Sequence, residues 1–128
     1  MQLQTHLKID SSLNGSVTQL KEGFAQVTLT TLPVMAADKE GLVHGGFIFA
    51  AADYAAMAVV NDPYVVLAKS NTKFIAPVKV GQIVILEATI TQTNGNKATV
   101  EVTATVEGKT VFSGEFFTAV LKQHVLTL

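Results

Sequence analysis

The chain has 128 residues, of which 48% are hydrophobic and 15% charged, and its formal net charge is −1. This length suits one domain, residues 1–128, with a core of its own, and the charge gives no sign of a basic nucleic-acid-binding surface. The lack of cysteine excludes disulfides and thiolate metal sites and is compatible with a cytoplasmic location. Because apolar residues are more frequent than in a typical domain, we expect part of the surface to be buried against another subunit.

The first quarter of the chain predicts an arm followed by two short strands. Residues 1–13 carry mixed signals and are expected to form an N-terminal arm or a short helix, and they contain no apolar run typical of a signal peptide. A first strand is expected at residues 17–20. Residues 25–30 alternate apolar and polar side chains, which predicts a half-buried strand that ends before Pro33.

The longest apolar stretch, residues 43–60, reads as one alanine-rich helix, since alanine is a strong helix former. Pro63 ends it, because proline cannot continue a helix. Apolar residues on every side predict that the helix is buried, yet Asp53 lies in its middle. A lone buried carboxylate is costly unless it is paired or protonated, so Asp53 is a candidate functional residue. The same carboxylate argues against a membrane-spanning helix.

The remainder of the chain is rich in alternating patterns that predict long strands. Four segments are expected to form strands: residues 64–74, 84–92, 98–106 and 110–121. Asn94-Gly95 is a strong hairpin signal between two of them. One buried helix needs a cover, and the simplest solution wraps an antiparallel sheet of five or six strands around it. The expected fold class is therefore α+β.

The start of the helix, His44-Gly45-Gly46, is a candidate site for binding a substrate oxygen. The first turn of a helix has free N–H groups and a partial positive charge, and glycine lets a substrate oxygen approach closely, as an oxyanion hole requires. A Gly-Gly pair here is, however, more often only a flexible entry, and His44 alone is more often a capping or core residue. Asp53 could serve as a nucleophile or general base, or equally as a structural hydrogen-bond acceptor.

Helix geometry separates the two candidate groups. Gly45 and Asp53 are eight residues apart, or about 12 Å along one helix axis, so they cannot both touch one carbonyl group. A second subunit whose helix runs the other way could bring its Asp53 to this Gly45. The spacing therefore predicts a twofold dimer with two sites at its interface.

The motif at residues 42–46, Leu-Val-His-Gly-Gly, followed by Asp53, resembles the acyl-CoA thioesterases of the hot-dog superfamily, of the phenylacetyl-CoA thioesterase (PaaI-like) type. Residues 74–81 are similar to that family's third-strand signature, and the resemblance covers about residues 14–121. It implies a hot-dog fold, in which a long central helix is wrapped by the sheet and homodimers form, often paired into tetramers. It also implies hydrolysis of an acyl thioester of coenzyme A or of an acyl carrier protein.

The resemblance further implies roles for individual residues. The Gly45 amide would polarise the thioester carbonyl, Asp53 of the partner would attack it or activate water, and His44 would help to orient the thioester. Candidate substrate-binding residues are Gly46, Asp38, Phe47, Ser70 and Asn71. Asp38 stands where the family often has asparagine, and a second carboxylate in the site would repel the first.

No metal is expected, because the three histidines show no ligand spacing, and coenzyme A enters only as part of the substrate. An alternative is that the same fold binds an acyl-CoA without turnover, as a sensor. Regulators that use a hot-dog domain in this way carry an attached DNA-binding segment, for which residues 1–13 are too short, and Asp53 favours chemistry. A hot-dog dehydratase or hydratase would show an Asp/His pair in its own motif, which is not found here.

Overall fold

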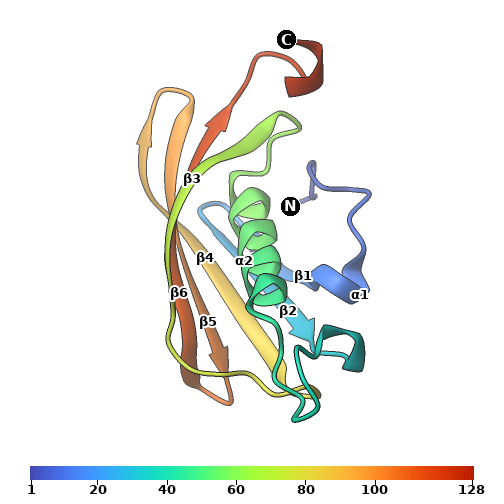
Figure 1. Ribbon diagram of the computed structural model, residues 1–128. Coiled ribbons are helices and arrows are strands. Elements are labelled where there is room, and N and C mark those ends of the chain that lie inside the picture. The colour runs from blue at the N-terminus through green and yellow to red at the C-terminus, as the bar shows by residue number, and fades with distance from the viewer.

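One long helix, α2 (Gly45–Val60), lies against one face of a six-stranded antiparallel sheet (Figure 1). The computed structural model describes residues 1–128. The strands are β1 (Ser16–Lys21), β2 (Phe24–Thr30), β3 (Val65–Phe74), β4 (Ile83–Asn94), β5 (Lys97–Val106) and β6 (Lys109–Val120). Three short helical segments complete the chain: α1 (Ser11–Asn14), η1 (Pro33–Met35) and η2 (Val125–Thr127).

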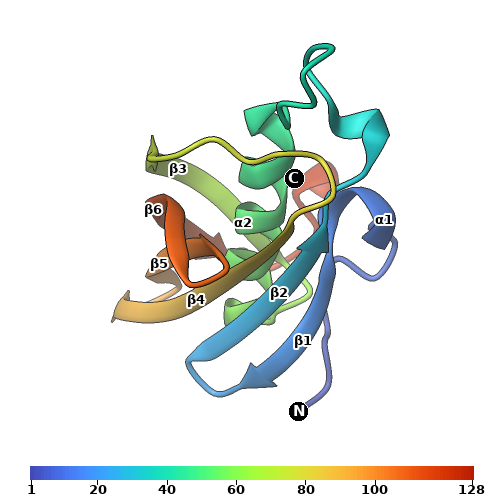
Figure 2. The ribbon, with the colours of Figure 1, turned by 90° about the horizontal axis from the view of Figure 1, so that it is seen from below.

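The strands are ordered β1-β2-β4-β5-β6-β3, so β1 and β3 form the two edges of the sheet. Each neighbouring pair is antiparallel. Seen from below, the sheet curves around α2 (Figure 2). The α+β fold class and the hot-dog arrangement expected from the sequence are therefore confirmed, with six strands in the sheet.

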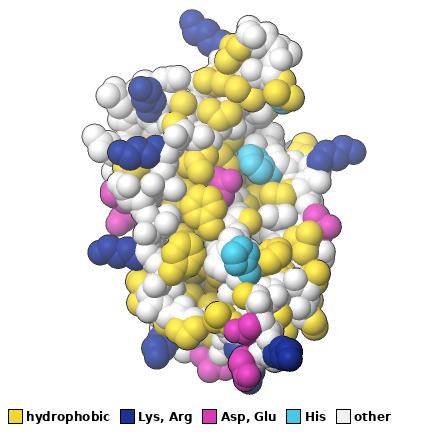
Figure 3. All heavy atoms as spheres, viewed as in Figure 1, with side chains coloured by type: hydrophobic (Ala, Val, Ile, Leu, Met, Phe, Trp, Pro, Cys, Tyr) yellow, Lys and Arg dark blue, Asp and Glu magenta, His cyan; other side chains and the backbone are white.

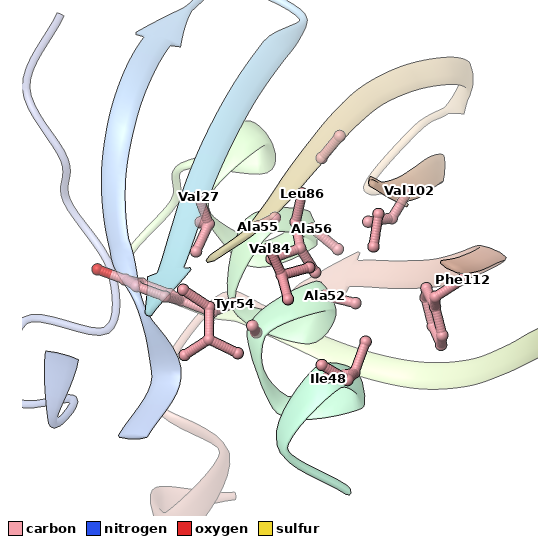
Figure 4. Close-up of a cluster of buried hydrophobic side chains, with 14 of the residues drawn as sticks. Val27, Ile48, Ala52, Tyr54, Ala55, Ala56, Val84, Leu86, Val102 and Phe112 are labelled. Atoms are coloured by element: carbon pink, nitrogen blue, oxygen red, sulfur yellow. The ribbon is translucent and has the colours of Figure 1, made fainter. Parts of the chain in front are cut away.

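The core lies between α2 and the concave face of the sheet. Side chains that alternate along the strands point inward, as Val27, Leu86, Val102 and Phe112 do toward the helix in Figure 4. Five alanines of α2 are fully buried: Ala51, Ala52, Ala55, Ala56 and Ala58. Because an alanine side chain is a single methyl group, the helix axis can lie close to the sheet. The packing of α2 therefore follows from its alanine content as much as from its large residues.

The helix begins two residues later than expected, at Gly45. Val43 N–H donates to the Val78 carbonyl at 2.8 Å, and His44 N–H donates to the Met35 carbonyl at 2.9 Å. These bonds hold both residues in extended conformation, so His44 becomes the N-cap residue. At the other end Asn61 adopts the left-handed conformation, with φ 55°, and closes the helix shortly before Pro63.

The first ten residues form an arm that precedes the short helix α1. Asn61 fixes this arm: its Oδ1 accepts a hydrogen bond from Gln4 N–H at 2.7 Å, and its Nδ2 donates to the Gln2 carbonyl at 2.9 Å. Leu3 and Ile9 pack against the core. The arm therefore returns to α2 and covers one side of it. None of the helices has the length and apolarity needed to cross a bilayer.

Candidate functional site

The first turn of α2 is open. The first N–H groups of any helix lack partners within the helix, and here no side chain caps them. Gly45 is half-buried and Gly46 is exposed. The helix tip therefore presents free hydrogen-bond donors and the positive end of the helix dipole to a ligand.

An apolar cavity of about 350 Å³ lies beside this turn, with Gly45 and Ile48 in its wall. Phe74 and Ile75 line its other side, and they are 58% and 53% exposed, which is unusual for such large apolar side chains. A Cβ at position 45 would lie 3.1 Å from Cε1 of Phe74. Glycine is therefore the residue that lets the helix tip and this aromatic wall approach each other.

His44, Gly46 and Phe47 gather at the same tip. The ring of His44 stands edge-on to Phe47, with centroids 6.2 Å apart. It also folds over Gly46, where an added Cβ would lie 3.2 Å from the imidazole. The structure therefore brings together four of the residues singled out from the sequence, namely His44, Gly45, Gly46 and Phe47.

Asp53 lies in the middle of α2 and is half-buried. Its Oδ1 is buried and has no hydrogen-bond partner. Burial raises the pKa of Asp53 above its ordinary value, and the nearby charge of His6 opposes that rise. Gly45 and Asp53 belong to one straight helix, so the separation of about 12 Å along its axis holds. One chain alone does not bring them together.

The sides of α2 differ in burial, contrary to the expectation that the whole helix is buried. Gly46, Phe49, Ala50 and Asp53 recur at helical spacing and are not buried. We call these four residues the outward stripe, because the buried alanines lie on the sheet side. In the view of Figure 3, hydrophobic side chains gather along the middle of the face over α2, with lysines at its margins.

Asp38 has a local role in the loop before the helix. Its Oδ1 accepts hydrogen bonds from the N–H groups of Glu40, at 3.0 Å, and Leu42, at 3.2 Å. The carboxylate thus holds the turn that leads into the helix. No hydrogen bond joins the Asp38 side chain to Asp53, Gly45 or Gly46.

Ser70 and Asn71 lie on opposite faces of β3, because successive strand residues point to opposite sides. Ser70 is paired with Phe116, a core residue whose ring lies 5.6 Å from that of Phe49. Asn71 is paired with Glu115, which is exposed on the outer face. Within one chain, therefore, only Ser70 faces the side of the sheet that carries α2.

Two residues near the site were not singled out from the sequence. Phe74 is visible in the sequence as an apolar residue before a proline-containing turn, but nothing there shows that it stays exposed. His6 stacks on Tyr54, with ring centroids 6.1 Å apart and an interplanar angle of 28°. No local sequence signal predicts this contact, because it depends on the return of the arm. No group of three or more His, Cys, Asp or Glu side chains could hold a metal ion.

Comparisons with known families and structures agree with this geometry. A family model described as "Thioesterase superfamily" matches residues 40–113, which include Gly45 and Asp53. Among solved structures, the uncharacterised protein PH1136 from Pyrococcus horikoshii is 44% identical, with a TM-score of 0.97 over 98% of this chain and 97% of that one. A hypothetical thioesterase from Streptococcus pneumoniae, solved with coenzyme A, is 20% identical with a TM-score of 0.81, over 93% of this chain and 95% of that one. At that identity the likeness shows the fold alone.

Curated relatives are longer than this chain. The chain is 50% identical over 121 residues, 94% of its length, to part of the methylthioribose-1-phosphate isomerase of Aquifex aeolicus, and it spans 26% of that protein. It is 40% identical over 86 residues, 66% of its length, to transcription factor FapR of Oceanobacillus iheyensis, and it spans 45% of that one. The chain therefore corresponds to a minor part of each of these two proteins.

Proposed function

Because the chain belongs to the thioesterase superfamily, we propose that it hydrolyses the thioester of an acyl-CoA or an acyl-carrier substrate. One observation carries the proposal. A carboxylate oxygen is buried without a partner on the outward stripe of α2, and the same helix opens, uncapped, beside an apolar cavity. A buried carboxylate without hydrogen bonds is costly, and such a cost is typical of a catalytic group.

The helix tip supplies the electrophilic half of the reaction. The Gly45 N–H donates a hydrogen bond to the thioester carbonyl oxygen, and the helix dipole stabilises the negative charge that develops there. His44, the N-cap residue, helps to orient the thioester. The acyl group lies along the apolar wall that Phe74 and Ile75 form.

Asp53 supplies the nucleophilic half in one of two ways. As a general base, its carboxylate takes a proton from water, and the oxygen of that water attacks the carbonyl carbon. As a nucleophile, it attacks the carbon directly and forms an anhydride that water then hydrolyses. In both cases the carbon–sulfur bond breaks, the sulfur leaves as the thiol after protonation, and the acyl group is released as the acid. Neither route uses a metal or a cofactor beyond the coenzyme A portion of the substrate.

The two halves meet across a homodimer. A second copy whose α2 runs antiparallel to the first places its Asp53 at this Gly45, and the twofold axis creates two identical sites. The apolar outward stripe and the free edge of β3 support this arrangement. Pairing of dimers into tetramers belongs to the same proposal, and so does a cytoplasmic location, which rests on the lack of cysteine.

The remaining candidate residues have different places in the proposed mechanism. Gly46 and Phe47 lie at the helix tip and are assigned to the thioester end of the substrate. Ser70, on the inner face of β3, is assigned to the acyl side. Asp38 shapes the approach to the helix through its hydrogen bonds, and Asn71, on the outer face of β3, is assigned no role within one protomer.

The test is a panel of acyl-CoAs assayed by release of free thiol, with the parent beside Asp53→Asn and Asp53→Ala. We expect turnover of at least one acyl-CoA and a loss of about 10²–10⁴-fold in both variants, the usual contribution of a general base. Full turnover by Asp53→Asn would remove Asp53 from the mechanism. Thiol release from none of the substrates would refute hydrolysis.

A second candidate function is binding of an acyl-CoA without turnover, as a sensor. The 40% identity to part of the transcription factor FapR favours it. Calorimetric titration with the same acyl-CoAs separates the two candidates. A parent protein that binds one of them tightly but releases no thiol supports the sensor.

A further inference from the structure

We propose that the acyl group of the substrate is an uncharged aliphatic chain of about eight to twelve carbons, and that Phe74 is the specificity-determining residue that selects it. The inference rests on the proposed function, because it names the acyl class that the same site accepts. Its basis is the cavity beside the helix tip, taken with its wall, its volume and the polar group at its end.

The wall of this cavity is apolar throughout. Of its ten lining residues eight are hydrophobic, and the other two are Gly45 and Pro77. No charged side chain lines it, and neither does any side chain that donates or accepts hydrogen bonds. An ionised or polar acyl group would therefore lose its hydration there without gaining a partner, which is costly.

The backbone of the outer wall offers few free donors, in contrast to the helix tip. The N–H groups of Ile75 and Ala76 both donate to the Val111 carbonyl, at 2.8 and 3.2 Å. The Gly45 N–H belongs to the uncapped first turn of α2 and is free. A ligand therefore meets a hydrogen-bond donor at one end and hydrocarbon beyond it. A thioester carbonyl followed by an alkyl chain has the matching pattern.

The volume of the cavity limits the length of that chain. An apolar cavity of about 150 Å³ holds one benzene molecule, so one of about 350 Å³ has room for roughly twice as many carbon atoms. A butanoyl chain leaves most of this space empty. A hexadecanoyl chain extends past the exposed side chains of Phe74 and Ile75 into water. A chain of about eight to twelve carbons fills the cavity.

Phe74 is placed to set this limit. Its ring stands edge-on to that of Phe112, with centroids 5.1 Å apart, and Phe112 is fully buried. The core therefore holds the ring of Phe74, although 58% of this residue is exposed. The ring also closes against the helix tip, because a Cβ at position 45 would lie 3.1 Å from its Cε1. Phe74 thus bounds the space next to the reacting carbonyl.

Two variants should move the chain-length limit in opposite directions. Phe74→Ala removes the ring and enlarges the cavity, so the limit should move to longer chains. Ala76→Leu adds a larger alkyl group to the lining at a partly buried position, so the limit should move to shorter chains. Phe117→Ala is the matched control. Phe117 is partly buried on the outer face of the sheet, where Lys69 Nζ lies 5.5 Å from its ring centroid.

The measurement is kcat/KM by thiol release for straight-chain acyl-CoAs from butanoyl to hexadecanoyl, each below its micellar concentration. In the parent we expect a rise of about fourfold per methylene that ends at about ten carbons, because further methylenes lie in water. Phe74→Ala should lower the octanoyl-CoA value about tenfold and move the end of the rise about two carbons or more toward longer chains. Ala76→Leu should end it about two carbons earlier, and Phe117→Ala should leave it in place.

Two results would overturn the proposal. One is a rise that continues to hexadecanoyl-CoA in the parent, and the other is an end of the rise that neither cavity variant moves. If Phe74→Ala does not fold, Ala76→Leu decides alone.

A second comparison tests the exclusion of charge. Hexanedioyl-CoA has the chain length of hexanoyl-CoA but ends in a carboxylate. We expect its kcat/KM to be about 10²-fold lower, because the carboxylate would enter the cavity without a cation to pair with. Equal values for the two substrates would contradict an apolar acyl site.

Binding separates a failure of this inference from a failure of the proposed function. S-alkyl-CoA thioethers cannot be hydrolysed, and calorimetric titration into the parent and the variants should give the same chain-length limit and the same shifts. If no acyl-CoA releases thiol but the thioethers show the limit, hydrolysis is refuted and the acyl site stands. If thiol is released but neither rate nor binding depends on chain length, the acyl site is refuted and hydrolysis stands.

Discussion

The two sides of α2 differ in how fully their side chains are buried and hydrogen-bonded within one chain. On the sheet side, Ala51, Ala52 and Ala55 are fully buried in a core that contains no unpartnered buried side-chain nitrogen or oxygen atom. On the outward stripe, Phe49 is only half-buried, and a buried oxygen of Asp53 lacks a partner. The sheet side therefore needs nothing beyond this chain. The outward side is the part that a substrate and a second copy would complete.

The sheet side should dominate stability. Phe112 is fully buried, so Phe112→Ala should lower the free energy of unfolding by about 3–5 kcal/mol. Phe49→Ala, its counterpart on the outward stripe, should cost only about 1–2 kcal/mol, because that side chain is partly exposed in one chain. Urea denaturation measures both. Equal losses would show that the two sides are packed alike, against this account.

The outward side should dominate activity, first through the helix tip. Gly45→Ala should lower kcat/KM about 10²-fold, because the new methyl group lies 3.1 Å from Phe74 and obstructs the approach of the carbonyl oxygen to the N–H donor. Gly46→Ala is the comparison: its Cβ would meet the exposed ring of His44, not Phe74, so a smaller loss of about tenfold or less is expected. If both variants behave alike in the thiol-release assay, the donor is not Gly45.

The charge on the outward stripe should also oppose stability. Burial raises the folded-state pKa of Asp53 above 3.8. Between 3.8 and that raised value, the folded chain binds more protons than the unfolded chain, so the free energy of unfolding contributed by this group falls as the pH rises. Asp53→Asn should therefore melt at a higher temperature than the parent at neutral pH.

That advantage should shrink as the pH is lowered toward 3.8, where the parent carboxyl becomes protonated in both states. Asp10, whose pKa is lowered by hydrogen bonds from the Ser12 hydroxyl and N–H, is common to both proteins and cancels. Melting curves from acid to neutral pH measure the difference. A variant that is less stable than the parent at pH 7 would show that Asp53 has a structural partner.

The smallest effect is expected at Asp38. Asparagine keeps an oxygen that can accept from Glu40 and Leu42, so Asp38→Asn should change stability by less than about 0.5 kcal/mol and should leave activity unchanged or slightly higher. Asp38→Ala removes the acceptor and should cost about 1 kcal/mol. Thermal melts and thiol release check both. A collapse of the rate in Asp38→Asn would make this carboxylate essential.

Local patterns were enough to predict most of the fold. The alternation at residues 98–106 places Val100 and Val102 on one face and Glu101 on the other, because the strand period is a property of neighbouring residues. In the structure the two valines are buried and Glu101 is exposed. The position of β3 at the sheet edge was not visible, because it depends on pairing with β6, which comes three strands later in the chain. The prediction started the helix at Val43, two residues too early. The hydrogen bond that keeps Val43 extended is to Val78, and the local sequence does not show a contact at that separation.

The site residues also divide into those that local sequence patterns predict and those that depend on nonlocal contacts. The spacing of Gly45 and Asp53 follows from the sequence once the helix is recognised. The faces of Ser70 and Asn71 do not, because β3 is largely polar there and an irregularity between Leu67 and Lys69 shifts its register. The position of His6 depends on the side chain of Asn61, far along the chain.

The central claim is that Gly45 of one protomer works with Asp53 of its partner. The most direct test mixes two inactive variants, Gly45→Val and Asp53→Asn, after dissociation and refolding. Half of the dimers should be mixed, and each mixed dimer should have one intact site of two, so we expect about a quarter of the parent rate to return. If the mixture stays as inactive as its components while mass spectrometry shows that mixed dimers have formed, both groups belong to one protomer and the shared site is wrong.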